Sequence, residues 1–263
     1  MQNSESWMRV DAAEQTTLDV MEKWQGKYRW KLGVGTTPCI QTRNGNRCSY
    51  CGFLDVNNPL PPELVGDFVE SVLAVKDSAH VSRLELYMSG SFFDDQEVSA
   101  MSRIQIIRAF SQTSIPELVV ESRPGFLKAA TFLELTPFIA PERLCIAVGV
   151  ETIHDHIRAK LQKGFSWSEV ERAIHCIAQT GATFQAYLML KLPGMESDSE
   201  AILDLVESAT YLIDVCRQEG CGLTIAVQPL IIVHGTWVHT QYEQGLLRPP
   251  WLYTIALSLH MLN

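Results

Sequence analysis

Residues 143–193 read RLCIAVGVETIHDHIRAKLQKGFSWSEVERAIHCIAQTGATFQAYLMLKLP, and this stretch decides the fold. It opens with an apolar run at 143–151 and closes with a second at 184–193, both of strand length. Between them, 166–181 begins with a Ser-x-x-Glu capping pattern and ends at Gly181, as a helix does. The stretch therefore predicts two strands joined by a helix, which is the unit of a parallel sheet.

The same alternation continues on both sides of this unit. Further strands are predicted at 31–38, 83–89, 117–122 and 222–232, and helices at 62–76, 95–111, 126–135, 197–220 and after Pro249-Pro250. The fold class that fits is α/β, with parallel strands in a partial (β/α)6 barrel of the TIM type; a flat doubly wound sheet is the competing arrangement. We expect a helical lead-in at 1–30, the barrel at 31–235 and a C-terminal extension packing on it at 236–263.

Composition excludes several classes of protein. Hydrophobic residues make up 46% and charged residues 19% of the 263 residues, so a sizeable core forms and global disorder is excluded. The net charge of -9 argues against a strongly basic nucleic-acid surface. No apolar run reaches the roughly 20 residues of a membrane helix, and from the polar N-terminus we expect no secretory signal. We expect a cytoplasmic protein without membrane contact, whose thiols stay reduced.

The seven cysteines fall into two groups, and their odd number argues against a disulfide framework. Four are dispersed and are expected to be structural: Cys145, Cys176, Cys216 and Cys221. Cys39, Cys48 and Cys51 instead share one loop after the predicted strand 31–38. With no nearby fourth Cys or His they do not close a zinc site. They can hold three irons of a 4Fe–4S cluster and leave one iron open; an incomplete zinc knuckle or three unrelated thiols are the alternatives.

Polar or small residues stand where the predicted strands end. They are Ser89-Gly90-Ser91, Glu121-Ser122-Arg123, Glu151, Lys191 and Gln228. In parallel α/β folds these carboxyl ends carry the functional groups, so we expect one polar pocket beside the cysteine loop. A buried charge needs a partner. Glu121 is therefore expected to meet a ligand amine, a ribose hydroxyl or Arg123, and Lys191 a ligand carboxylate.

The cysteine loop resembles the cluster loop of radical S-adenosylmethionine (SAM) enzymes. Its pattern, Cys39-x8-Cys48-x2-Cys51 with Tyr50 before the last cysteine, is similar to the longer loop in the branch that contains the Elongator catalytic subunit. Several further segments resemble the same branch, and come closest to the radical-SAM subunits of archaeosine synthases, which act on a modified tRNA base: ESRPGFL, VGVET, IRAKLQKGFSWSEVERAI, AYLMLKLPGMESDSEAI and RPPWL. The resemblance covers roughly residues 31–255.

This resemblance implies a 4Fe–4S cluster held by Cys39, Cys48 and Cys51, with SAM chelated by the open iron. One electron, from a flavodoxin- or ferredoxin-type donor, would cleave SAM and release a 5′-deoxyadenosyl radical that abstracts hydrogen from a substrate. The substrate implied is a modified tRNA base or nucleoside, with a partner subunit supplying RNA binding. A small metabolite is the alternative substrate. A non-catalytic iron–sulfur or zinc-binding module is the alternative of a different class.

The resemblance also implies positions that bind SAM. Tyr50 is expected to pack near the adenine, Glu151 to face the ribose or methionine, and Lys163 to face the carboxylate. The predicted SAM-binding set is Tyr50, Ser89, Gly90, Ser91, Glu121, Glu151, Lys163 and Lys191. A second set is predicted at the periphery of SAM and substrate: Arg123, Arg158, Tyr187 and Gln228.

Overall fold

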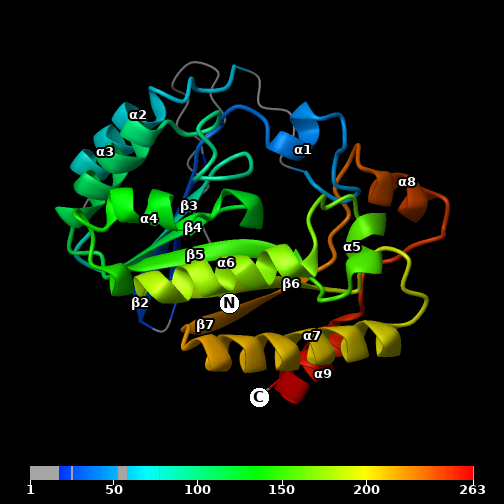
Figure 1. Cartoon of the computed structure of the whole chain (residues 1–263). Coiled ribbons are helices and arrows are strands. Elements are labelled where there is room, and N and C mark those ends of the chain that lie inside the picture. The colour runs from blue at the N-terminus through cyan, green and yellow to red at the C-terminus, as the bar shows by residue number, and fades with distance from the viewer. Residues whose placement is uncertain (1–17, 25, 53–57, 77, 263) are drawn as a thin grey trace.

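The computed structural model describes residues 18–24, 26–52, 58–76 and 78–262, and its strands form one curled sheet (Figure 1). The strands are β1 (Leu18–Trp24), β2 (Lys27–Gly33), β3 (Val81–Tyr87), β4 (Glu117–Glu121), β5 (Leu144–Glu151), β6 (Thr183–Leu190) and β7 (Leu223–Pro229). β2 to β7 are parallel, and each pairs with the next along the chain. A doubly wound sheet reverses its strand order part-way, and this sheet does not. The predicted partial barrel is therefore confirmed.

Helices connect the strands and cover the outer face of the sheet. The longer ones are α2 (Val65–Val75), α3 (Ala100–Ser111), α6 (Trp167–Thr180), α7 (Asp198–Glu219) and α9 (Leu252–Leu262). The shorter ones are α1 (Ile40–Arg43), α4 (Ala129–Leu135), α5 (Asp155–Lys160), α8 (Trp237–Glu243) and the 3-10 turns Pro124–Phe126 and Pro141–Arg143. The predicted capping box of α6 forms between Ser166 and Glu169. None of the helices in the described ranges combines the length and apolar character that a membrane crossing requires.

The segment before the barrel corrects the prediction of a helical lead-in over 1–30. Residues 1–17 lie outside the described residues, while Leu18–Trp24 is strand β1, antiparallel to β2. Gly26, with φ +80°, lies in the turn between them. Asp19 of β1 accepts a 2.8 Å hydrogen bond from the indole of Trp30. Pairing with β2 decides the conformation here, because strand formation depends strongly on neighbouring strands.

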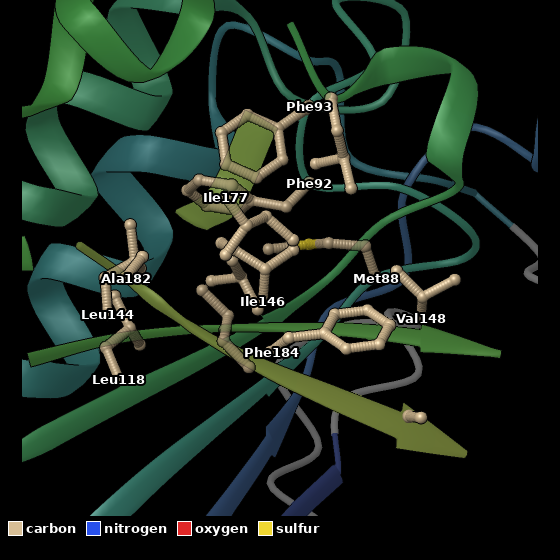
Figure 2. Packing of buried hydrophobic residues seen from close by; sticks show 14 of the residues in the cluster. Met88, Phe92, Phe93, Leu118, Leu144, Ile146, Val148, Ile177, Ala182 and Phe184 are labelled. Atoms are coloured by element: carbon tan, nitrogen blue, oxygen red, sulfur yellow. The ribbon is translucent and has the colours of Figure 1, made fainter. Parts of the chain in front are cut away.

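The main hydrophobic core lies between the sheet and its helices. Leu84 and Leu86 of β3 and Phe184 of β6 are fully buried there. Figure 2 shows Phe92 and Phe93 in the same cluster, and their rings meet edge to face with centroids 5.2 Å apart. Burying such side chains stabilises the fold by about 25 cal/mol per Å². The two phenylalanines thereby anchor the chain just beyond β3, where the predicted Ser89–Ser91 segment lies.

Candidate functional site

The three predicted cluster ligands lie on one loop after β2. Cys39 directly precedes α1, and the Arg43 amide donates to the Cys39 carbonyl at 3.0 Å. The Cys51 amide donates to the Cys48 carbonyl at 3.2 Å. All three side chains are half-buried, and none of them forms a disulfide. The loop therefore presents three cysteine side chains at the carboxyl edge of the sheet.

Residues distant in sequence hold this loop in place. The Ser49 amide donates to the Leu161 carbonyl at 3.2 Å, just after α5. The Val238 amide of α8 donates to the Ser49 carbonyl, also at 3.2 Å. The Cys48 thiol lies 3.6 Å from the Gln162 carbonyl. The middle of the loop is thus clamped between α5 and α8.

Gly90 lies directly against the first cysteine. A Cβ added to Gly90 would stand 2.1 Å from the Cβ of Cys39, so no larger residue fits without displacing the loop. Among the described residues, no three His, Cys, Asp or Glu side chains converge as a ready metal site. The fit to a cluster therefore rests on donor chemistry: three thiolates suit three irons of a 4Fe–4S cluster.

The Ser89–Ser91 turn is fixed by hydrogen bonds to Thr36 and Glu97. The Ser89 hydroxyl donates to the Thr36 carbonyl at 2.8 Å, and the Ser91 amide donates to Glu97 Oε2 at 2.9 Å. Glu97 is fully buried, and this burial raises its pKa to about 7. Glu97 was not predicted from the sequence, because it lies several residues after the predicted strand 83–89 and belongs to no recognised motif.

Three residues of the predicted SAM-binding set meet at one point. The Tyr50 hydroxyl donates to Glu151 Oε1 at 2.7 Å, and Lys163 Nζ lies 3.0 Å from both the Glu151 oxygen and the Tyr50 hydroxyl. Burial, followed by the charge of Glu151, raises the pKa of Tyr50 well above its ordinary value, so the phenol stays protonated. Glu151 has φ +65°, a conformation that costs energy for a non-glycine residue.

Gly149 makes room for this Tyr50–Glu151–Lys163 trio. A Cβ on Gly149 would stand 2.8 Å from Glu151 Oε1 and 2.9 Å from Lys163 Nζ. Because both distances are shorter than van der Waals contact, a larger residue would displace the ends of the Glu151 and Lys163 side chains.

Lys191 and Arg158 are not brought to the trio. Lys191 Nζ donates to Asp198 Oδ1 at 2.7 Å, and Asp198 also accepts from the Thr254 hydroxyl. Arg158 is buried and pairs with Asp155. Both cations have anionic partners within the fold and take no part in the hydrogen bonds of the trio, so the ligand contacts predicted for them stay predictions.

The remaining predicted residues are spread around the carboxyl edge. Burial raises the pKa of Glu121 to about 7, an effect that the Tyr187 hydroxyl partly offsets. Arg123 does not form the ion pair considered for Glu121; its guanidinium instead donates to the Lys163 carbonyl. Gln228 is exposed on the edge strand β7.

A charged layer on the inner face of the sheet was also missed. Arg83 Nε lies 3.4 Å from Glu85 Oε1, and the Arg83 guanidinium donates to Gln185 across the barrel interior. The Tyr87 hydroxyl donates to Glu85 Oε2 at 2.6 Å. The period-two alternation of RLELY at 83–87 carried this signal, since alternate strand residues face one side of the sheet. The interior of the half barrel therefore contains a layer of charged and polar side chains.

Comparison with solved structures identifies the fold. Coproporphyrinogen III oxidase (HemN) from Escherichia coli, described as a radical SAM enzyme, matches with a TM-score of 0.51 over 87% of this chain and 50% of its own, at 10% identity. This chain therefore has the same fold as that radical SAM enzyme. Elp3 of the archaeon Methanocaldococcus infernus matches with a TM-score of 0.55 over 89% of this chain and 53% of its own, at 14% identity. At such identities the likeness concerns the fold alone.

Sequence comparison finds similar proteins among the archaea, although no protein-family model matches the chain. Archaeosine synthase subunit beta of Methanosarcina acetivorans is 28% identical over 250 residues, covering 94% of this chain and 66% of the relative. The protein of the same name from Thermococcus kodakarensis is 24% identical, covering 83% and 67%. The chain thus spans about two thirds of the length of these relatives. The resemblance drawn from the motifs is confirmed.

Proposed function

We propose that this chain is a radical SAM enzyme that reductively cleaves SAM at a 4Fe–4S cluster held by Cys39, Cys48 and Cys51. The observation that carries the proposal is that the trio includes a residue of the cysteine loop. Tyr50, on this loop, forms hydrogen bonds with Glu151 and Lys163. When bound, the cluster would supply the electron that cleaves a carbon–sulfur bond of SAM and releases a 5′-deoxyadenosyl radical. The chain's own residues have to bind SAM, orient it and exclude water.

The trio has the donors and acceptors that this task needs. A carboxylate accepts hydrogen bonds from an ammonium or a ribose hydroxyl, and an ammonium donates to a carboxylate. In the described structure Glu151 and Lys163 satisfy each other at 3.0 Å. Because buried charges need replacement partners, we propose that the amino, carboxylate and ribose groups of SAM exchange for these bonds.

We propose a modified nucleoside or tRNA base as substrate, held in the polar interior of the half barrel. Two archaeal relatives named archaeosine synthase subunit beta support this class, and the word subunit supports a partner chain. The net charge of -9 leaves most phosphate contacts to such a partner. The same charge favours a small metabolite as the second candidate.

Anaerobic iron–sulfur reconstitution tests the function directly. We expect about four irons per chain, and release of 5′-deoxyadenosine and methionine when dithionite and SAM are added. Cys48→Ala should lose both properties. Cys176→Ala, on the buried face of α6, should keep them. Retention of both by Cys48→Ala would refute the proposal. Iron loading without SAM cleavage would identify a non-catalytic iron–sulfur module.

Binding of tRNA separates the two substrate classes. A tRNA-acting chain, alone or with its partner subunit, should bind tRNA with an affinity that falls steeply as salt rises, because phosphate contacts release counterions. A metabolite enzyme should show no such binding.

A further inference from the structure

One side of the cysteine loop opens to the surface in a hollow of about 350 Å³. Three segments line this hollow, and we call it the Cys48 hollow. They are Arg47, Cys48 and Ser49 of the loop, Lys160 and Gln162 at the end of α5, and Gly235, Thr236 and Trp237 at the start of α8. Cys48 is the only one of the three predicted cluster ligands among these lining residues. Of the three, it is therefore the ligand that meets this surface.

The charge of the Cys48 hollow is opposite to that of the chain. Its lining residues include two cations, Arg47 and Lys160, and no acid, whereas the whole chain has 30 Asp and Glu against 21 Lys and Arg. Lys160 is exposed to solvent. A positive surface on an acidic protein favours the approach of an acidic partner and steers its encounter.

An exposed aromatic ring stands beside these cations. Trp237 is 51% exposed, although the next residue of α8, Val238, is fully buried. Tryptophan and arginine are enriched among the residues that dominate protein–protein binding energy. The Cys48 hollow thus combines an apolar anchor with a basic rim.

The surface around the Cys48 hollow is held together by its own hydrogen bonds. Ser49 is clamped between Leu161 and Val238, both at 3.2 Å. The side-chain amide of Gln41 donates to the Gln162 carbonyl at 2.9 Å. A surface built in advance loses less entropy when a partner docks.

We propose that the Cys48 hollow is the docking surface for an acidic one-electron donor protein, an inference that rests on the proposed function. The donor would lose one electron and the cluster would gain it, with no bond made or broken. The electron enters through Cys48, because this ligand lines the hollow and the other two do not. Lys160 and Arg47 recognise the acidic face of the donor, and Trp237 supplies apolar contact area.

Binding of purified flavodoxin, the probe for the acidic donor, tests the surface. Calorimetry on the wild-type chain should detect complex formation that weakens as salt rises. Lys160→Glu should weaken the affinity about tenfold at low salt, because it places like charges opposite each other. Lys128→Glu is the matched control: it makes the same change in charge at an exposed residue before α4, away from α5 and α8 (Figure 1), and should leave the affinity unchanged. Trp237→Ala should weaken binding at every salt concentration.

Reduction of the reconstituted protein separates this inference from the proposed function. Dithionite is small and needs no docking surface, so it should drive SAM cleavage equally in wild type, Lys160→Glu and Lys128→Glu. Reduced flavodoxin should drive it more slowly in Lys160→Glu alone. Failure with dithionite in the wild type would refute the proposed function. If dithionite drives SAM cleavage but Lys160→Glu binds flavodoxin as tightly as the wild type does, the proposed docking surface is wrong. Salt-sensitive tRNA binding that Lys160→Glu abolishes, with flavodoxin binding unaffected, would overturn it too and mark the hollow as an RNA contact.

Discussion

The hydroxyl of Tyr50 donates a 2.7 Å hydrogen bond to the carboxylate of Glu151, a residue 101 positions further along the chain. The bond joins the cysteine loop after β2 to the carboxyl end of β5. Because burial keeps the phenol protonated, Tyr50 is a permanent donor to this carboxylate. The loop and the sheet edge are therefore coupled before any ligand binds.

Tyr50→Phe removes this hydroxyl and keeps the ring. We expect the free energy of unfolding to fall by about 1 kcal/mol, the net value of a typical hydrogen bond, measured by urea denaturation. Tyr211→Phe is the control, since Tyr211 is 44% exposed on α7. Equal stability changes in the two variants would contradict a structural role for the Tyr50 bond.

Gly90→Ala tests the close approach of the turn to Cys39. The new Cβ would stand 2.1 Å from the Cys39 Cβ, so the loop has to move. We expect a loss of about 1–3 kcal/mol in the free energy of unfolding, as overpacking typically costs, together with reduced iron loading. Gly125→Ala, whose Cβ meets no heavy atom within 4 Å, should change neither quantity. Normal iron loading by Gly90→Ala would argue against this packing.

Asp198→Asn should destabilise the fold more than Asp214→Asn, although both residues lie on α7. Burial alone would raise the pKa of Asp198, but hydrogen bonds from Lys191 and Thr254 hold it well below its usual range. Removing this charge leaves buried Lys191 without its anion, which costs about 3 kcal/mol or more. Asp214 forms an exposed pair with Arg217, worth about 1 kcal/mol or less. Urea denaturation of both variants measures the difference, and equal losses would contradict the role of Lys191–Asp198.

Glu97 makes stability depend on pH. Burial raises the pKa of its carboxyl from 4.5 to about 7 in the folded state, so between these values the folded chain keeps a proton that the unfolded chain has lost. The protonated Glu97 therefore stabilises the fold relative to the ionised form. This stabilisation is complete below pH 4.5 and is lost as the pH rises to about 7.

The side chain in Glu97→Gln cannot ionise. As the pH rises from 5 to 8, the free energy of unfolding of the variant should therefore increase relative to that of the wild type. The gain should reach about 3 kcal/mol at most, at 1.36 kcal/mol for each pH unit. Unfolding at both pH values measures it. Glu134→Gln, at an exposed position of α4, should differ from wild type by the same amount at both. A pH-independent difference for Glu97→Gln would contradict the raised pKa.

Local patterns predicted most of the barrel because each element carries its own signal. The capping box at Ser166 and Glu169 and the stop at Gly181 placed α6 to within one residue at each end. β1 was missed, since its conformation depends on pairing with β2 rather than on its own sequence. The charged inner layer around Arg83 and Glu85 was missed because the strands were interpreted as apolar runs instead of alternating faces.

The trio illustrates what sequence can and cannot place. Tyr50, Glu151 and Lys163 were each predicted from motifs, and the structure brings them together at 2.7–3.0 Å. Lys191 was predicted by the same reasoning, yet Asp198 neutralises it. The difference lies in a partner from the next helix, which no strand-end pattern contains.

The order of residues along the chain by itself determined the βα alternation, the three clustered cysteines and the polar strand ends, because periodicity, caps and spacing are local properties. Only the tertiary structure decided which charges face one another and which cysteine of the loop lines the Cys48 hollow. Those outcomes depend on contacts between segments up to 189 residues apart, as between Ser49 and Val238, and such contacts form only when the whole chain has folded around the curled sheet.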